Sequence, residues 1–130
     1  APATAYAMAK FGMSLVVLGL AGEQRGKIAG NALWPRTTIA TAAIKNLLGG
    51  DTMMRMSRTP AILADAAYRI FAKDVSFTGN FLIDDTFLAS EGVTDFDQYR
   101  ADPSQPLQPD FFVPDTMPPP QGVILGKNNW

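Results

Sequence analysis

Apolar residues occupy almost every side of a helix drawn through residues 4–24, which predicts one long helix at the start of the chain. Thr4 is expected to cap its first turn, and the polar residues 23–26, which end in glycine, are expected to stop it. A helix that is apolar all round is normally buried on two sides. An ordinary core helix of a monomer fits this pattern.

Two apolar runs later in the chain predict strands of a parallel sheet that is covered on both faces. Residues 28–34 form the first strand, and Pro35 ends it because proline cannot donate to a sheet. Residues 75–83 form the second strand. Between the two strands, Thr59 as the cap and Pro60 as the first helical residue predict a helix with apolar positions at helical spacing.

Two further segments, one after the first strand and one after the second, are predicted from their local chemistry. Methionines in residues 42–58 suit an adaptable apolar surface, and Gly49-Gly50 would serve as a hinge, although methionine packs irregular cores just as well. Asp84 and Asp85 resemble a carboxylate pair for acid/base chemistry. Because neighbours on a strand point to opposite faces, we interpret them instead as a turn and a helix cap before a short helix at 86–92.

The character of the chain changes near residue 94, because most of its prolines lie beyond that point. Residues 94–130 are therefore predicted to form an extended, proline-rich tail that wraps a surface. Residues 107–112 supply apolar anchors, and we expect them to dock this tail on the body of the protein or on another subunit.

Composition narrows the functional classes. The chain has 130 residues, which is one domain's worth, and its net charge of −1 leaves no basic surface for nucleic acid. Without cysteine or histidine it has no disulfides, no thiolate metal sites, no imidazole base and no imidazole zinc ligands. For the same reason we expect no metal. We also expect no membrane partner, because the apolar run 11–21 is too short to span a bilayer. The lack of cysteine and of a targeting segment fits an intracellular, cytoplasmic protein.

Tyr6 and Lys10 are the residues with candidate chemistry. They are four positions apart, so they share one face of the predicted helix, roughly 5–6 Å apart at Cβ. A neutral phenol is a poor base, and an ammonium beside it favours the phenolate form, which suits acid/base catalysis. Such a pair also occurs often by chance, so the spacing taken alone favours an ordinary helix surface.

The order of the segments resembles the second half of the short-chain dehydrogenase/reductase family, and the resemblance covers most of residues 4–112. Each motif alone is weak, but the motifs occur in the same order as in the family. They are the Tyr-x-x-x-Lys helix, Asn-x-Leu-x-Pro at 31–35, a Thr-rich loop at 37–41 and Thr-Gly-x-x-Leu-x-Asp at 78–84.

One branch of the family matches more closely, and the segments that carry this match are 9–14, 31–35, 64–68 and 107–112. The chain also departs from the family's pattern at two places. Arg36 stands where a glycine usually follows the proline, and Asp85-Thr86 stands where a Gly-Gly pair is common.

The resemblance implies an α/β fold, in which residues 1–93 are the C-terminal half of a doubly wound, Rossmann-type parallel sheet with flanking helices. It also implies an oxidoreductase that moves a hydride between NAD or NADP and a carbonyl or alcohol. Tyr6 would be the general acid/base, and Lys10 would activate it and bind the nicotinamide ribose. The other site residues implied are Pro35, Thr37, Ile39 and Thr41 for the cofactor, together with Tyr6 and Lys10, and Trp34, Met53 and Met54 for the substrate.

The sequence lacks the family's glycine-rich phosphate loop, G-x-x-x-G-x-G, as well as its catalytic serine and the asparagine of its proton relay. We therefore expect activity only together with an N-terminal half of the same protein, in a homodimer or homotetramer. The alternative is a non-catalytic fragment or homologue that acts as an oligomerisation or binding module. A small monomeric ligand carrier is a third hypothesis, supported only by the methionine-rich segment.

Overall fold

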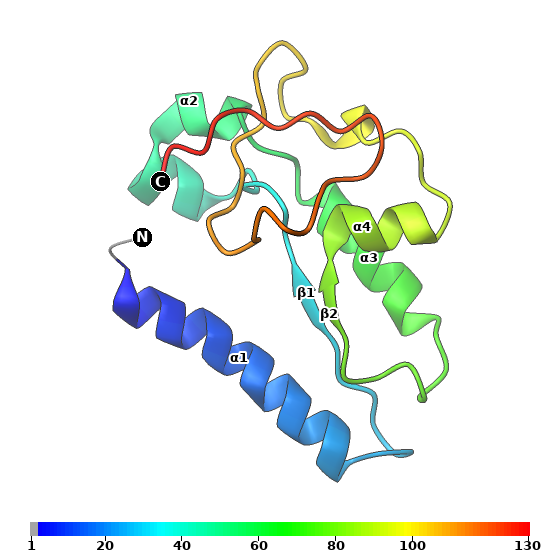
Figure 1. The fold of residues 1–130 in the computed structure, drawn as a ribbon. Helices are drawn as coiled ribbons and strands as arrows, with labels where there is room; N and C mark the ends of the chain where they lie inside the picture. The colour runs from blue at the N-terminus through cyan, green and yellow to red at the C-terminus, as the bar shows by residue number, and fades with distance from the viewer. Residues whose placement is uncertain (1–2) are drawn as a thin grey trace.

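Two short parallel strands lie at the centre of the computed structural model, which describes residues 3–130 (Figure 1). β1 (Ala32–Trp34) pairs with β2 (Phe81–Ile83). α1 (Thr4–Glu23) contacts β1, whereas α4 (Asp84–Ser90) contacts β2 and α3 (Ala61–Phe71). A parallel pair whose strands are joined through a helical crossover is the unit of α/β proteins, in agreement with the predicted class.

Both strands are shorter than predicted, because the Asn31 side chain takes the place of the backbone ladder before β1. Its Nδ2 donates to the Phe77 carbonyl oxygen at 2.8 Å, and its Oδ1 accepts from the backbone nitrogen of Asn80 at 3.2 Å. Residues 28–31 and 75–80, which were predicted as strand, are therefore loops joined by side-chain hydrogen bonds. Regular backbone pairing is confined to β1 and β2.

α1 begins at the predicted residue 4 and ends within one residue of its predicted end, but its cap and its burial differ from the predictions. Ala3 occupies the cap position, and its carbonyl oxygen accepts from the Ala7 nitrogen at 2.8 Å. Thr4 therefore lies inside the first turn and is not the cap. Among the described residues of α1 only Ser14 and Ala21 are buried, so this chain does not itself provide the expected burial on two sides.

The apolar stretch in α1 is also longer than predicted. Within residues 3–130, only this helix of 20 residues is long and apolar enough to cross a membrane, by length and composition. The core helix of a soluble protein and a signal sequence pass the same test. The run 11–21 is therefore part of a longer apolar helix, and the expectation of no membrane partner stays a prediction.

The remaining helices begin near their predicted positions. The methionine-containing segment forms a π-helix, η1 (Ile44–Leu48), followed by α2 (Gly50–Arg55). α3 has Pro60 at its cap position, and the Thr59 carbonyl oxygen, rather than the predicted side-chain cap, accepts from the Ile62 nitrogen at 3.3 Å. α4 starts before the predicted residue 86, because Asp84 Oδ1 accepts from the Asp85 nitrogen at 2.7 Å in its first turn.

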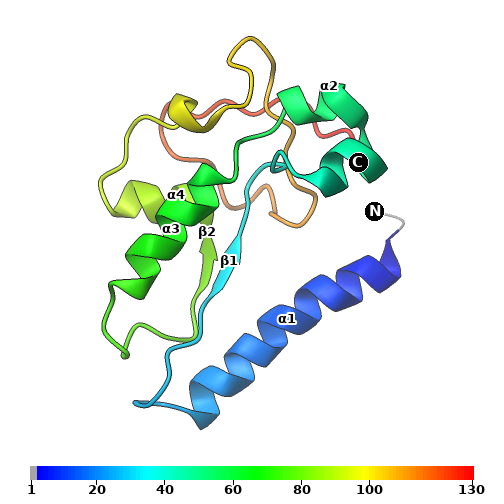
Figure 2. The ribbon, with the colours of Figure 1, turned by 180° about the vertical axis from the view of Figure 1, so that it is seen from behind.

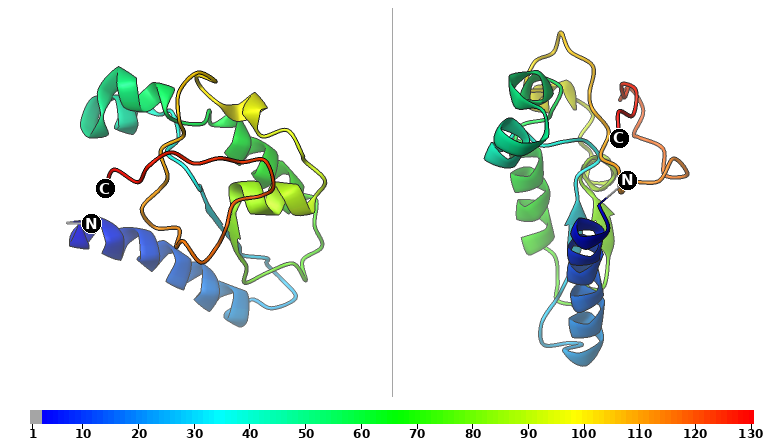
Figure 3. Two further views of the ribbon diagram at one scale, coloured as in Figure 1. Left: turned by 45° about the horizontal axis from the view of Figure 1, so that its top comes forward. Right: turned by 90° about the vertical axis from the view of Figure 1, so that its left-hand side faces the viewer.

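The tail contributes to the hydrophobic core of the body. Beyond η2 (Asp97–Tyr99) it crosses the strand ends, and the C-terminus lies beside the N-terminal end of α1 in every view (Figures 2 and 3). Leu107 and Gln108 are buried, which confirms that the anchor region docks on the body. One cluster of buried apolar residues combines Ile39, Ile62, Ala66, Phe87 and Leu88 from the body with Phe96 and Tyr99 from the tail.

Candidate functional site

Tyr6 and Lys10 of α1 line one cavity, which lies beside the C-terminal end of β1. The cavity has a volume of about 270 Å³, and Lys10 Nζ lies 5.3 Å from the centre of the Tyr6 ring. The two side chains therefore share one face of the helix. Further walls of the cavity come from Trp34 and Pro35 at the end of β1 and from the tail.

A side-chain hydrogen bond fixes the end of β1 against α1. Trp34 Nε1 donates to Ser14 Oγ at 3.1 Å, and the Trp34 and Phe11 rings lie 5.2 Å apart between their centres. Ser14 is buried even though most of its helix is exposed. The bond therefore sets the position of Trp34, the predicted substrate residue, relative to the helix that carries Tyr6.

Asp110 and Phe112 of the tail also line this cavity, and sequence reasoning did not assign them to a site. Burial raises the pKa of the Asp110 carboxyl, and the N–H groups of Phe111 and Phe112 and the charge of Lys10 oppose that rise. The Phe112 ring stacks on the Tyr6 ring, with 5.7 Å between centres and 15° between planes. The apolar residues at 107–112 indicated that the tail docks, but they did not indicate that it docks beside Tyr6.

The cavity gathers only part of the predicted site. The predicted residues that line it are Tyr6, Lys10, Trp34 and Pro35. Those that do not line it are Thr37 and Ile39, which are buried, Thr41, which is exposed, and Met53 and Met54 in α2. The roles assigned to this second group stay predictions.

Backbone hydrogen bonds hold residues 37–40 between Arg58 and the tail. The Thr38 nitrogen donates to the Gln108 carbonyl oxygen at 3.0 Å, and the Ala40 nitrogen donates to the Arg58 carbonyl oxygen at 2.8 Å. Successive residues of an extended chain present their N–H and C=O groups to opposite sides. Ile39 therefore turns its own backbone groups away from Arg58, while its side chain packs in the core.

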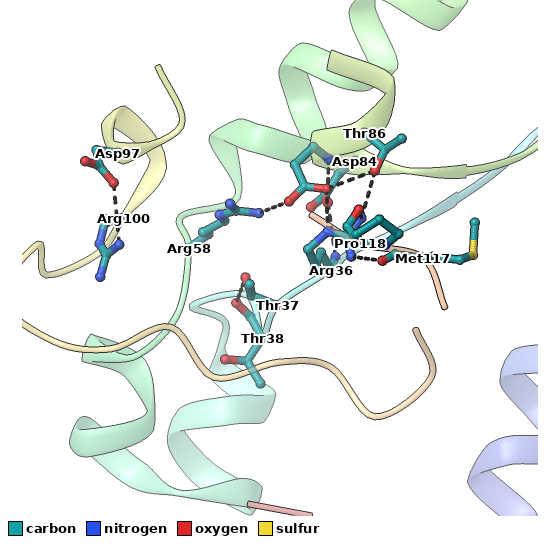
Figure 4. A network of polar contacts seen from close by, with 11 residues as sticks. Arg36, Thr37, Thr38, Arg58, Asp84, Thr86, Asp97, Arg100, Met117 and Pro118 are labelled. Atoms are coloured by element: carbon teal, nitrogen blue, oxygen red, sulfur yellow. Dashed lines mark hydrogen bonds and ion pairs between the residues drawn. The ribbon is translucent and has the colours of Figure 1, made fainter. Parts of the chain in front are cut away.

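Next to this loop lies a buried charge cluster, which we define as Arg36, Arg58, Asp84 and Asp85 (Figure 4). Arg36 Nε donates to one Asp85 oxygen at 2.7 Å, and Arg58 Nη1 donates to the other at 2.9 Å. Asp84 Oδ1 accepts from the Arg36 backbone nitrogen at 3.0 Å. The prediction of a turn and a helix cap was therefore wrong. Ile83 holds the cap position of α4, and both carboxylates lie in its first turn, buried against distant arginines.

The charge cluster is not fully paired. Within residues 3–130, Arg58 Nε and Nη2 and Asp84 Oδ2 are buried without a hydrogen-bond partner. Burial raises the pKa of Asp84 to about 6, and the charge of Asp85 adds to the rise. The Arg36 backbone N–H and the charge of Arg58 act in the opposite direction.

No protein-family model matches the chain. It is similar to hydroxysteroid dehydrogenase-like protein 2 of Danio rerio, with 54% identity over 110 residues, which cover 85% of this chain and 26% of that protein. The chain thus spans about a quarter of the length of the curated relatives it matches.

Two solved structures share the fold. A short-chain dehydrogenase from Mycobacterium thermoresistibile matches with a TM-score of 0.76 and 50% identity, over 88% of this chain and 41% of its own. A protein described as a dehydrogenase from Xanthomonas campestris matches with a TM-score of 0.78 and 50% identity, over 86% of this chain and 41% of its own. The resemblance and the α/β fold class predicted from the sequence are therefore confirmed.

Proposed function

We propose that this chain supplies the catalytic helix of an NAD(P)-dependent dehydrogenase, which transfers a hydride between NAD or NADP and a carbonyl or alcohol. One observation carries the proposal: Tyr6 and Lys10 share a face of α1 and open into one cavity at the end of β1. The similarity to short-chain dehydrogenases supports it. Because the chain covers 41% of that solved structure, an N-terminal half of the same protein would complete the site.

In this proposal the Tyr6 hydroxyl holds and moves the proton. The phenol donates its proton to the carbonyl oxygen during reduction, and the phenolate accepts a proton from the alcohol during oxidation. The Lys10 ammonium stabilises the negative charge on the Tyr6 oxygen after the proton has left. The cofactor, when bound, supplies the hydride chemistry.

The groups that this chain presents fit a nicotinamide cofactor. Lys10 lines the cavity, and its ammonium would bind the ribose hydroxyls. The backbone groups of Ile39 face away from Arg58 and would pair with the carboxamide. The buried Thr37 Oγ1 donates to the Thr38 carbonyl oxygen at 3.1 Å and so supports the loop, and its role towards the cofactor stays a prediction.

The exposed side of α1 supports assembly into a dimer or tetramer. Leu15, Val16 and Leu18 are 66%, 60% and 51% exposed, which is unusual for large apolar side chains on one helix. The same observation favours the second candidate function, in which the chain is a non-catalytic oligomerisation or binding module. Turnover separates the two functions.

The test is oxidation of NADH and NADPH by the complete protein with a panel of aldehydes and ketones. Replacing Tyr6 with Phe should lower kcat by a factor of about 10²–10⁴ and leave cofactor binding largely intact, because only the proton donor is lost. Tyr68→Phe is the matched control, since Tyr68 lies on α3 and is 76% exposed. Full turnover by the Tyr6 variant would reject the assigned role, and a wild-type protein without turnover would favour the binding module.

A further inference from the structure

Phe112 lines both the cavity of Tyr6 and a second cavity, whose walls are almost wholly apolar. The second cavity has a volume of about 340 Å³ and lies between α1, the two strands and the tail. Ser14, Trp34 and Phe112 line both cavities. Ser14 of α1 and Trp34 of β1 are hydrogen-bonded to each other. Phe112 is the only one of these three residues that belongs to the tail.

The Phe112 ring is wedged among the aromatic side chains that surround Tyr6. Besides stacking on Tyr6, it meets Phe11 edge-on, with 5.2 Å between centres and 79° between planes. It meets Trp34 edge-on as well, at 5.8 Å and 89°. Stacked and edge-to-face pairs at these separations are the favoured geometries of aromatic rings. Phe112 therefore has a defined position in front of Tyr6.

The backbone of the tail is bonded to the body on both sides of Phe112. Before it, the Asp110 nitrogen donates to the Arg36 carbonyl oxygen at 2.8 Å. After it, Arg36 Nη1 donates to the Met117 carbonyl oxygen at 2.7 Å, and Nη2 donates to that of Pro118 at 3.2 Å. Since Arg36 is itself held by Asp85, the charge cluster anchors the segment that carries Phe112.

We propose that Phe112 is a specificity-determining residue, whose ring is the partition that keeps substrate out of the apolar cavity. This inference rests on the proposed function. Only the Tyr6 cavity then receives substrate, so the protein favours carbonyl compounds with short or slender substituents. Removal of the ring joins the two cavities, and the combined space accepts the alkyl chain of a long ketone because the added walls are apolar.

The experiment compares acetone with methyl nonyl ketone as substrates of the complete protein. Phe112→Ala should raise the ratio of kcat/KM for the long ketone to kcat/KM for acetone by about tenfold, the scale on which apolar pockets discriminate chain length. Phe112→Leu should shift the ratio less and in the same direction. Phe111→Ala is the matched control, because Phe111 also packs on the Tyr6 ring, at 5.9 Å between centres, but lines neither cavity.

Refilling the cavity provides the converse test. Val113 lines the apolar cavity, so Val113→Phe added to Phe112→Ala should return the ratio towards the wild-type value. The partition is overturned if Phe112→Ala leaves the ratio unchanged or lowers it, or if Phe111→Ala raises it equally.

Binding without turnover keeps this inference separate from the proposed function. The Tm of each variant is measured with and without methyl nonyl ketone, which also shows whether the variants fold. A larger Tm increase in Phe112→Ala than in wild type and in Phe111→Ala supports the partition even if no protein turns over a carbonyl. Equal increases in the three proteins overturn it.

Discussion

Arg36 Nε donates to Asp85 Oδ1 at 2.7 Å, and this buried bond joins residues 49 positions apart. Arg36 Nη2 also donates to Thr86 Oγ1 at 2.8 Å. Arg36 and Asp85-Thr86 are the positions where the sequence departs from the glycines common in short-chain dehydrogenases. The two departures meet in space: the buried guanidinium of Arg36 has its carboxylate and hydroxyl acceptors on the residues that replace the Gly-Gly pair.

Replacing Asp85 with Ala should lower the free energy of unfolding by about 3–5 kcal/mol, because it leaves the buried guanidinium groups of Arg36 and Arg58 without their shared carboxylate. Urea denaturation of the complete protein measures the change. Asp97→Ala is the control, since Asp97 is largely exposed and its contact with Arg100 is 3.4 Å long, so its removal should have little effect. Similar midpoints for the two variants would contradict the idea that Asp85 holds the cluster together.

The pH dependence of stability should change when Asp84 becomes Asn. The pKa of Asp84 is raised from 3.8 to about 6 in the folded protein, mainly by burial, so between these values the folded state binds more protons than the unfolded state. Its contribution to stability is therefore present at low pH and is lost as pH rises from about 4 to about 6.

Asn keeps the oxygen that accepts from the Arg36 and Asp85 nitrogens and has no such titration. The free energy of unfolding of Asp84→Asn, relative to wild type, should thus rise between pH 4 and pH 6 and then level off near neutral pH. Parallel urea midpoints for the two proteins across this pH range would show that Asp84 does not titrate as described.

Replacing Tyr99 with Phe should destabilise the packing of the tail by about 1–2 kcal/mol, because the Tyr99 hydroxyl donates to Asp65 at 2.6 Å. Burial and the Asp65 carboxylate together raise the pKa of Tyr99 to about 12, so the phenol keeps the proton that it donates to Asp65. Thermal unfolding measures the loss. Tyr68→Phe on the same helix as Asp65 is the control, since Tyr68 is exposed; equal Tm values for both variants would mean that the bond contributes nothing.

The strand boundaries show what local patterns miss. Apolar character predicted strands over 28–34 and 75–83, yet pairing is confined to three residues in each. The reason is the Asn31 side chain, whose bonds to Phe77 and Asn80 replace the ladder across more than forty residues of sequence. Polar residues within an apolar run carry no local sign of such a distant partner.

The candidate site divides in the same way. Tyr6 and Lys10 share a face because the helical period places residues four apart on one side, which a sequence shows directly. The order of helices and strands, and hence the α/β class, likewise follows from local periodicity and from the motifs in their order. These are the features that the sequence by itself determined.

Only the tertiary structure decided which residues surround Tyr6. Phe112 reaches Tyr6 from the far end of the chain, and Asp85 reaches Arg36 from beyond β2. Neither contact has a period or a spacing along the sequence, because each depends on how the tail and α4 fold back over the strand ends. The same physical reason explains why the prediction for Met53 and Met54 of α2 could not be placed from the sequence. Their chemistry suited a substrate surface, but they lie outside the cavity of Tyr6.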